Sequence, residues 1–535
     1  MTTDATRSRR ISFAAAALAS VAVLYLGVRY GTFAAADNDP YGYVSEADAM
    51  ANGTLRVDQQ FARTFDWPHA ELTFSPPGWR PGPVRGFIVP VYPSGLPMLM
   101  AAVQRIGGRR AIYYVVPVLG ALTVWLTALL GRRFHTPLTA AISALLVASS
   151  PVFLYQIVQP VSDVPAAFWW LLALTLAFHR TRAASFAAGL AASMAILTRP
   201  NLVPLAVVPA AYLAWPALTR STTGREGAIR SAMAFAVATV PGCLAVAVLN
   251  QHLHGSPFES GYWQQSELFA WSHVGPNLDR YPRWLLEAQT PFICIGLFAP
   301  VIVRRDGTWL LWTFAVAVIV SYLFYAPFGR DESGYLRFLL PAFPPLLILS
   351  VAACVDGLAR TRLRSTGAAA LTAIACAALA GWEGREALRR GAFTLRIAER
   401  RYVDVGNYIG RMMPSNAIFF AAAQSGSIRY YSNRLTVRFD LLEPHRLDYA
   451  VAALEQQSFH TYIALEEDEE AQFRDRFGAF NELGHLDWPP VAERSEPVRV
   501  KIYDPADRRR FLAGEALGTA DIDLTKKPKL TRKKP

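Results

Sequence analysis

The sequence predicts an α-helical protein that crosses a membrane many times and carries a smaller α/β domain near its carboxyl end. Hydrophobic residues make up 53% of the 535 residues and charged residues only 18%, a balance that favours a membrane protein. Apolar stretches recur along the first 383 residues, and charged residues become dense beyond them. Short arginine clusters separate the apolar stretches, which is the pattern that orients a chain in a bilayer.

Eleven apolar segments are expected to cross the membrane. A spanning helix needs about 20 residues, and the shorter segments are expected to break or to be buried within the bundle. The first segment is expected to be retained, because signal-peptide cores are shorter, about 7–15 residues. The predicted spans are 11–33, 111–131, 136–157, 163–179, 184–198, 200–217, 231–250, 289–303, 308–327, 336–356 and 366–382.

The arginine clusters predict the orientation. With eleven spans and a cytoplasmic amino terminus, every cluster falls on the cytoplasmic side, as the positive-inside rule requires. The clusters are Arg7/Arg9/Arg10, Arg132/Arg133, Arg180/Arg182, Arg220/Arg225/Arg230, Arg304/Arg305 and Arg360/Arg362/Arg364. Segments 34–110 and 251–288, and everything after about residue 383, are then expected to face outward from a plasma or inner membrane. Within the first of these segments, residues 89–108 are apolar but interrupted by prolines, so they predict an interfacial helix.

The change in residue composition along the chain predicts three domains. These are 1–383 in the membrane, 384–510 as an extracytoplasmic α/β domain, and 511–535 as a basic disordered tail. The stretches "NAIFFAAA", "RLTVRFD", "HTYIALEE" and "VRVKIYD" predict strands, and "EPHRLDYAVAALEQQ" and "EEDEEAQFRDRFGAF" predict amphipathic helices. Alternating strands and helices favour an α/β arrangement.

Other classes are excluded by charge placement and cysteine spacing. The net charge is +12, but its arginines lie between apolar stretches, so no nucleic-acid partner is expected. The four cysteines lie inside apolar segments, where neither a disulfide framework nor a zinc site is indicated.

Ionisable residues at the membrane rim are costly, so they indicate function. Those expected on the outer side are Asp37, Asp39, Asp163, Arg199, Glu259, Arg330, Asp331, Glu332 and Arg337. We expect them to line one polar cavity that opens outward. Arginine suits a phosphate, because its planar fork donates two hydrogen bonds at once. A carboxylate suits deprotonation of a hydroxyl or binding of a divalent metal, so a phosphorylated lipid and a hydroxyl-bearing acceptor would satisfy both.

Each candidate also has a structural explanation. For Asp37 and Asp39, the sequence Asp-Asn-Asp-Pro is typical of a turn. Asp163 is placed to cap a helix, and Arg199 could extend to the membrane interface. Arg337 could pair with Asp331 or Glu332. Ordinary loop contents would account for Glu259 and Tyr262, and an interfacial aromatic belt for Tyr92.

The chain resembles type-C integral-membrane glycosyltransferases, the superfamily of polyprenyl-phosphate-mannose protein mannosyltransferases and aminoarabinose transferases. The resemblance covers most of residues 1–356. It rests on the order and spacing of "DNDPYGYVSEA", "YPSGLPMLMA", "SPVFLYQIVQPVSDVPAAF", "GLAASMAILTRPN", "NQHLHGSPFESGYW" and "YLRFLLPAFPPLLIL".

The resemblance implies transfer of a sugar from a polyprenyl-phosphate donor to a hydroxyl of a glycan, lipid or protein, on the extracytoplasmic face and with inversion. It implies that Asp39 is the general base, with Asp37 as its substitute. Arg199, Arg337 and Arg330 would bind the donor phosphate, and Asp163, Glu259, Tyr262 and Tyr92 would shape the site. A divalent metal held by Asp39 and Asp163 is left open, because Asn38 splits the paired acidic residues found in some members.

Two other functions remain as alternatives. A transporter or flippase for a lipid-linked sugar would favour repeated halves with broken helices at matching positions, and the sequence shows no such symmetry. An O-antigen ligase or polymerase would carry its large outer loop late in the chain, whereas here the long loop comes first.

Overall fold

The computed structural model describes residues 2–219, 222–262, 265–326, 333–360, 365–522 and 530–533. The chain forms two compact units. Unit 1 comprises Met1–Gly31, Pro93–Leu249 and Tyr262–Thr394, and unit 2 comprises Thr32–Tyr92, Asn250–Gly261 and Leu395–Pro535. Each unit is therefore built from three separate stretches of the chain.

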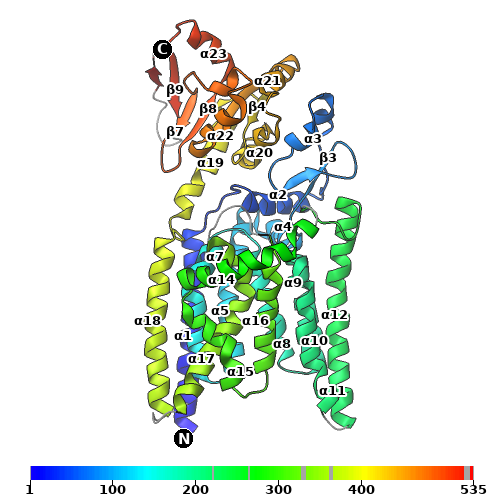
Figure 1. The fold of residues 1–535 in the computed structure, drawn as a ribbon, viewed down its shortest axis with the longest axis vertical. Coiled ribbons are helices and arrows are strands. Elements are labelled where there is room, and N and C mark those ends of the chain that lie inside the picture. The colour runs from blue at the N-terminus through cyan, green and yellow to red at the C-terminus, as the bar shows by residue number, and fades with distance from the viewer. Residues whose placement is uncertain are drawn as a thin grey trace. The chain divides into compact units, whose positions relative to one another are not determined.

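Unit 1 is helical (Figure 1). Its α-helices are α1 Thr2–Tyr30, α4 Gly95–Gly107, α5 Val115–Phe134, α6 Pro137–Ser149, α7 Pro151–Ile157, α8 Asp163–Ala177, α9 Arg182–Thr198, α10 Val207–Ala214, α11 Pro216–Thr219, α12 Thr222–His254 (which ends in unit 2), α13 Gln265–Leu268, α14 Val274–Ala288, α15 Ala299–Ile302, α16 Thr308–Leu323, α17 Phe343–Ala359 and α18 Ser365–Arg389. Its 3-10 helices are η2 Arg109–Tyr114, η3 Pro200–Ala206, η4 Trp271–His273, η5 Pro291–Phe298 and η6 Ser333–Ala342.

The apolar helices of unit 1 make the chain a multi-pass membrane protein. Among the described residues, six helical segments are long and apolar enough to cross a bilayer. The bent pair α6–α7 would be a seventh, and four shorter apolar helices cover 163–177, 182–198, 291–302 and 308–323. Every predicted span thus overlaps an apolar helical segment, while eleven complete crossings stay a prediction.

The break between α6 and α7 follows from local sequence. Pro151 has no N–H to donate to the preceding turn, and Ser150 caps the new helix by accepting the Phe153 N–H at 3.4 Å. The two helices meet at 63°. This part of the structure therefore shows the broken helix expected of a buried span.

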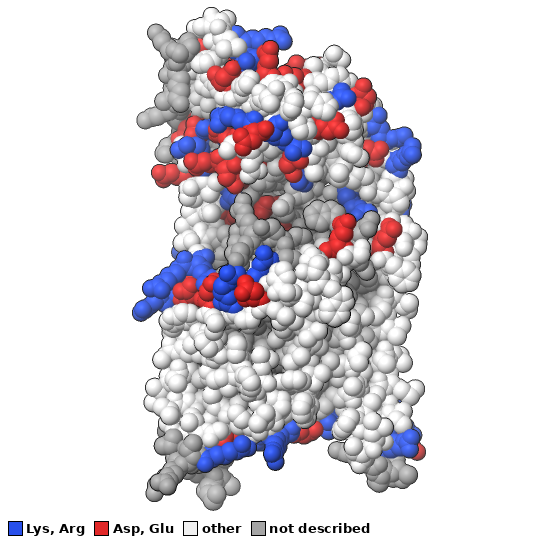
Figure 2. Space-filling view, in the orientation of Figure 1, with Lys and Arg blue, Asp and Glu red and all other residues white. Residues whose placement is uncertain are grey.

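The arginine-bearing loops gather at one end of unit 1. Arg180 donates to Asp306 at 3.0 and 3.1 Å, and Asp356 contacts both His135, at 2.9 Å, and Arg305, at 3.8 Å. Figure 1 shows the amino-terminal end of α1 together with α11 and α15 at this end. In Figure 2, basic side chains, which are arginines because no lysine precedes residue 501, border a broad uncharged belt there. The described arginine loops thus lie at one end of unit 1, while Arg220, Arg362 and Arg364 lie outside the described residues. The cytoplasmic location of the loops stays a prediction.

Unit 2 contains a seven-stranded mixed sheet with the order β10-β9-β7-β8-β6-β4-β5. Its strands are β4 Ala417–Phe420, β5 Leu435–Val437, β6 His460–Glu466, β7 Ala492–Arg494, β8 Val500–Tyr503, β9 Leu517–Asp521 and β10 Leu530–Lys533. The helices of this part are α19 Leu395–Met412, α20 Ser425–Ser432, α21 Leu447–Gln456, α22 Glu467–Phe477 and α23 Pro505–Leu512, with 3-10 helices η7 Phe439–Leu441 and η8 Leu483–His485.

The predicted strands and helices of this region are found at β4, β5, β6, β8, α21 and α22. Central strand β6 pairs in parallel with β4, where Phe419 lies opposite Tyr462, and antiparallel with β8. Strands β9 and β10 fall in the range 511–535, where the structure differs from the disordered tail that the sequence predicts. Leu517 and Thr519 are both buried, so alternate apolar and hydroxyl side chains give this stretch an inner face.

The first stretch of unit 2 packs into the same core as the large sheet. It contains α2 Asp39–Ala51, η1 Gln60–Thr64, α3 Ala70–Thr73 and a small sheet of β1 Val57–Asp58, β2 Trp79–Pro81 and β3 Phe87–Pro90. Phe65, Trp67 and Phe74 share one buried cluster with Phe420 and Phe439. Residues far apart in sequence therefore form a single hydrophobic core.

Candidate functional site

Asp39 is the first residue of α2. It follows Asn38 at the helix boundary and precedes Pro40, whose fixed φ suits a first helical turn. The side chain is half-buried, and its Oδ1 accepts a hydrogen bond from the Tyr92 hydroxyl at 2.6 Å. Helix α2 thus begins with the Asp39 carboxylate, and the hydroxyl of Tyr92, 53 positions later in the chain, fixes the direction of this carboxylate.

Two glycines make room for the Tyr92 ring. A β-carbon at Gly42 would lie 2.2 Å from Cε2 of Tyr92, and one at Gly78 would lie 2.8 Å from the same atom. Gly78 also has a φ of +76°, which residues with side chains rarely adopt. Tyr92 packs in addition against Tyr43, with ring centroids 4.8 Å apart. The position of the Tyr92 hydroxyl therefore depends on the absence of two side chains.

Asp37 lies two residues before α2, with a φ of +47°. The residue as a whole is exposed, but protein surrounds its carboxyl. Desolvation by the surrounding protein, followed by the charges of Asp39 and Glu466, raises the pKa of its carboxyl to about 6, and Arg401 partly opposes the shift. A carboxyl with a pKa near neutrality is a stronger base than an ordinary aspartate. The role of Asp37 as a substitute base for Asp39 stays a prediction.

Asp163 and Arg199 form a buried ion pair in unit 1. Asp163 Oδ1 accepts from Arg199 Nη2, and the two residues are 1% and 7% exposed. Arg199 also donates to Ser162 Oγ at 3.4 Å and to Tyr322 Oη at 3.2 Å. The side chain of Asp163 is committed to Arg199 more than to helix capping, and Arg199 is buried in protein and does not extend to a lipid interface.

Arg337 lies near the same ion pair. Its guanidinium carbon is 5.2 Å from the centre of the Phe338 ring, and that of Arg199 is also 5.2 Å from it. Phe338 stacks on Tyr322 with centroids 5.3 Å apart and ring planes at 11°. Packing therefore places Arg199 beside Phe338, the sequence neighbour of Arg337, so that both guanidinium groups lie near one aromatic ring.

Tyr322 and Phe338 were not among the predicted site residues. Tyr322 is 2% exposed and accepts hydrogen bonds from both Arg199 and Asn201, each at 3.2 Å. The signal in the sequence is weak, because each residue lies in an aromatic run typical of any membrane interface.

The remaining predicted residues are less informative. Arg330 lies outside the described residues, as do Asp331 and Glu332, the partners considered for Arg337. Glu259 is exposed in the unit 2 stretch Asn250–Gly261, and Tyr262 is half-buried at the start of the next unit 1 stretch. The roles of these residues stay predictions.

The described residues contain no group of three or more His, Cys, Asp or Glu side chains that could hold a metal ion. Asp39 belongs to unit 2 and Asp163 to unit 1, so their joint part in a metal site stays a prediction. Oδ1 of Asp39 accepts from the Tyr92 hydroxyl, and Oδ1 of Asp163 accepts from Arg199. A divalent metal at either carboxylate stays a prediction.

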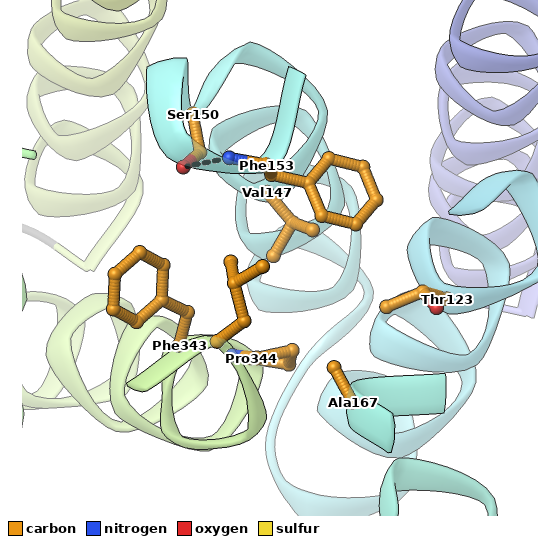
Figure 3. A pocket seen from close by; sticks show the side chains of 8 residues that line it. Thr123, Val147, Ser150, Phe153, Ala167, Phe343 and Pro344 are labelled. Carbon is orange, nitrogen blue, oxygen red and sulfur yellow. Dashed lines mark hydrogen bonds between the residues drawn. The ribbon is translucent and has the colours of Figure 1, made fainter. Parts of the chain in front are cut away.

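A small hollow in unit 1 lies beside the break between α6 and α7 (Figure 3). Apolar side chains dominate its lining, and Thr123 and Ser150 are its two polar residues. Ser150 Oγ accepts the Phe153 N–H and donates to Gln289 at 2.6 Å. None of the predicted site residues lines this hollow, so we do not assign it to the reaction.

Comparisons with known proteins give a family-model match and a fold. Residues 93–244 match the dolichyl-phosphate-mannose-protein mannosyltransferase family model. No curated protein matches the chain by sequence.

Several solved structures share the fold. ArnT from Cupriavidus metallidurans, bound to undecaprenyl phosphate, is 14% identical with a TM-score of 0.53, over 92% of this chain and 97% of that one. The Archaeoglobus fulgidus oligosaccharyltransferase, in complex with Zn and sulfate, is 13% identical with a TM-score of 0.56, over 92% of this chain and 73% of that one. The resemblance expected from the sequence motifs is thus confirmed: the chain has the fold of the type-C membrane glycosyltransferases.

Proposed function

We propose that the protein transfers a sugar from a polyprenyl-phosphate donor to an acceptor hydroxyl on the extracytoplasmic face of the membrane. The family-model match and the fold support this class of reaction. Similar structures contain such lipids: ArnT holds undecaprenyl phosphate, and the A. fulgidus AglB structure, with a TM-score of 0.54, holds dolichol-phosphate. The amino terminus would then be cytoplasmic and the sheet of unit 2 extracytoplasmic.

The single observation that carries the catalytic assignment is the hydrogen bond from Tyr92 to Asp39, 2.6 Å long. It fixes the direction of the carboxylate that would accept the proton. In the proposed step, Asp39 takes the proton of the acceptor hydroxyl as that oxygen attacks the anomeric carbon. The bond from this carbon to the phosphate oxygen breaks, and the polyprenyl phosphate leaves with the electron pair. A single displacement inverts the anomeric centre.

The arginines would stabilise the leaving phosphate, since guanidinium groups donate two hydrogen bonds to two phosphate oxygens. Arg337 is half-buried and is the better placed of the two described candidates. Arg199 already pairs with Asp163, so it would contribute through its field and through the placement of Phe338.

The test is deletion of the gene in the source organism, followed by mass analysis of the envelope glycans and complementation with variants. Wild type and Asp48→Asn, a matched control on α2, should restore the missing sugar. Asp39→Asn should not restore it, although the variant is inserted at wild-type abundance. Restoration by Asp39→Asn would exclude Asp39 as the base. Loss of the sugar in the deletion strain, with sugar-phosphate lipid accumulating on the cytoplasmic side instead of the outer side, would support a flippase.

A further inference from the structure

Residues 34–41, the segment that carries both first-loop aspartates, lie against α19 and α20. Ala34 and Ala36 are 0% and 1% exposed and pack in one cluster with Tyr402 of α19, itself 1% exposed. The two alanines are small, and the large ring of Tyr402 fills the space beside them. The backbone that leads to Asp39 is therefore held by residues about 365 positions later in the chain.

A hydrogen bond ties the same segment to α20. The Ala35 N–H donates to the Tyr431 hydroxyl at 2.8 Å. Tyr431 is itself placed by close packing of α20 on α19, because a β-carbon at Gly406 would lie 2.6 Å from Cβ of Tyr431. Ala35 lies outside any helix or strand, so its N–H has no ladder partner and the Tyr431 hydroxyl satisfies it.

The first turn of α2 meets α20 at a glycine. A β-carbon at Gly426 would lie 2.5 Å from Cδ1 of Tyr41 and 2.8 Å from Cε1. Tyr41 is 4% exposed and comes two residues after Asp39. Any side chain at position 426 would have to displace the ring, and with it the helix turn that begins at Asp39.

Asp37 lies beside a cluster of charged residues, in which Arg401 partly offsets the repulsion from the other carboxylates. Arg401 of α19 donates to Glu466 at 2.8 Å, to Glu399 at 3.2 Å and to the Tyr402 hydroxyl at 2.9 Å. Asp37 interacts electrostatically with both Arg401 and Glu466. One guanidinium thus lies among three carboxylates, one of which belongs to the first-loop segment.

We propose that α19 and α20 position the catalytic aspartate, with Tyr402, Gly426 and Tyr431 as positioning residues that hold segment 34–41. The proposal rests on the proposed function of Asp39. It gives the sheet-bearing part of unit 2 a task in the transfer step that is separate from any contact with the acceptor.

The decisive variant is Gly426→Ala. Alanine favours a helix over glycine, so α20 itself should not weaken, and any loss must come from the Tyr41 ring. We expect at least a tenfold lower transfer rate, together with faster hydrogen exchange of the amides of residues 34–44. Gly381→Ala is the matched control, because this helical glycine has open space around its β-carbon position.

A second variant avoids any steric change. Tyr431→Phe removes the hydroxyl and retains the ring, and loss of one net hydrogen bond of about 1 kcal/mol predicts roughly fivefold faster exchange at Ala35. Tyr41→Leu should rescue Gly426→Ala, since it removes the atoms that collide, so the double variant should match Tyr41→Leu alone in rate and in exchange.

Exchange and transfer are read separately, so the two proposals can fail independently. Unchanged exchange of residues 34–44 in both Gly426→Ala and Tyr431→Phe overturns the positioning role, whatever the transfer rate. Faster exchange with a wild-type rate also overturns it. Wild-type transfer by Asp39→Asn overturns the catalytic assignment instead, while the exchange data still show whether α19 and α20 hold the segment.

Discussion

The Tyr92 hydroxyl donates a 2.6 Å hydrogen bond to the carboxylate of Asp39. Both residues belong to unit 2. The Tyr92 ring packs against Gly42 and Gly78, where no side chain blocks it. A carboxylate fixed in direction before substrate binds is what a general base requires, because proton transfer depends on geometry first. The predictions below test this contact and the arginine cluster of unit 1.

Gly42→Ala should separate Tyr92 from Asp39. The added methyl would lie 2.2 Å from the ring, so the ring must move and the hydrogen bond should be lost. A hydrogen bond to a charged group contributes about 1.5–3 kcal/mol, and we expect a fall in turnover of at least tenfold. Gly227→Ala, on α12 with open space around it, is the control. Full turnover in both variants would show that Tyr92 does not position the base.

Asp37→Asn should change how stability depends on pH. Folding raises the pKa of Asp37 from 3.8 to about 6, so the folded protein binds more protons than the unfolded chain between those values. Stability therefore falls as pH rises through this window. The variant, which has no charge to desolvate, should unfold at a higher temperature than wild type at pH 7.5 and at the same temperature near pH 3.5. Thermal unfolding in detergent at both pH values measures this, with Asp48→Asn as the control, and a constant difference at all pH values would contradict it.

Asp163→Asn should destabilise unit 1. The substitution leaves the Arg199 guanidinium buried without its carboxylate partner, and breaking a buried ion pair in this way costs about 3–5 kcal/mol. The double variant Asp163→Asn with Arg199→Gln removes both charges and should regain much of the loss. Thermal unfolding of the three proteins measures the coupling, and equal unfolding temperatures in all of them would show that the pair contributes nothing.

Arg337→Gln should weaken binding of the donor lipid without unfolding the protein. The side chain is half-buried, and its guanidinium carbon lies 5.2 Å from the centre of the Phe338 ring. Loss of a charge-assisted hydrogen bond to phosphate predicts about tenfold weaker binding of undecaprenyl phosphate. Arg283→Gln, at an exposed pair with Asp279 on α14, should bind as wild type does. Equal affinity in both variants would remove Arg337 from the phosphate site.

The sequence predicts well those features that depend on local composition. The apolar runs and the loops with arginine clusters are detectable because each is a property of adjacent residues, and the helices and strands near 417–503 follow their own periodicity. The contacts of the site depend on distant partners. Asp163 meets Arg199 across 36 positions and Asp39 meets Tyr92 across 53.

Two kinds of residue escape a sequence-based prediction altogether. Gly42 and Gly426 matter because of the space they leave for Tyr92 and Tyr41, and a glycine in a helix gives no sign of which ring will approach it. Tyr322 and Phe338 join the two arginines only after three helical segments pack together. Composition also predicts a disordered tail after residue 511, whereas strand β9 there is set by pairing with β7 and β10.

The most direct test of the account uses purified protein in liposomes with a panel of polyprenyl-phosphate-linked mannose, arabinose and aminoarabinose, and measures the release of polyprenyl phosphate when a hydroxyl acceptor is present. The account predicts release by wild type and by Asp48→Asn with at least one donor. It predicts at least 100-fold slower release by Asp39→Asn, a typical loss on removal of a general base, with undecaprenyl phosphate binding unchanged. Release by Asp39→Asn at the wild-type rate would contradict the account.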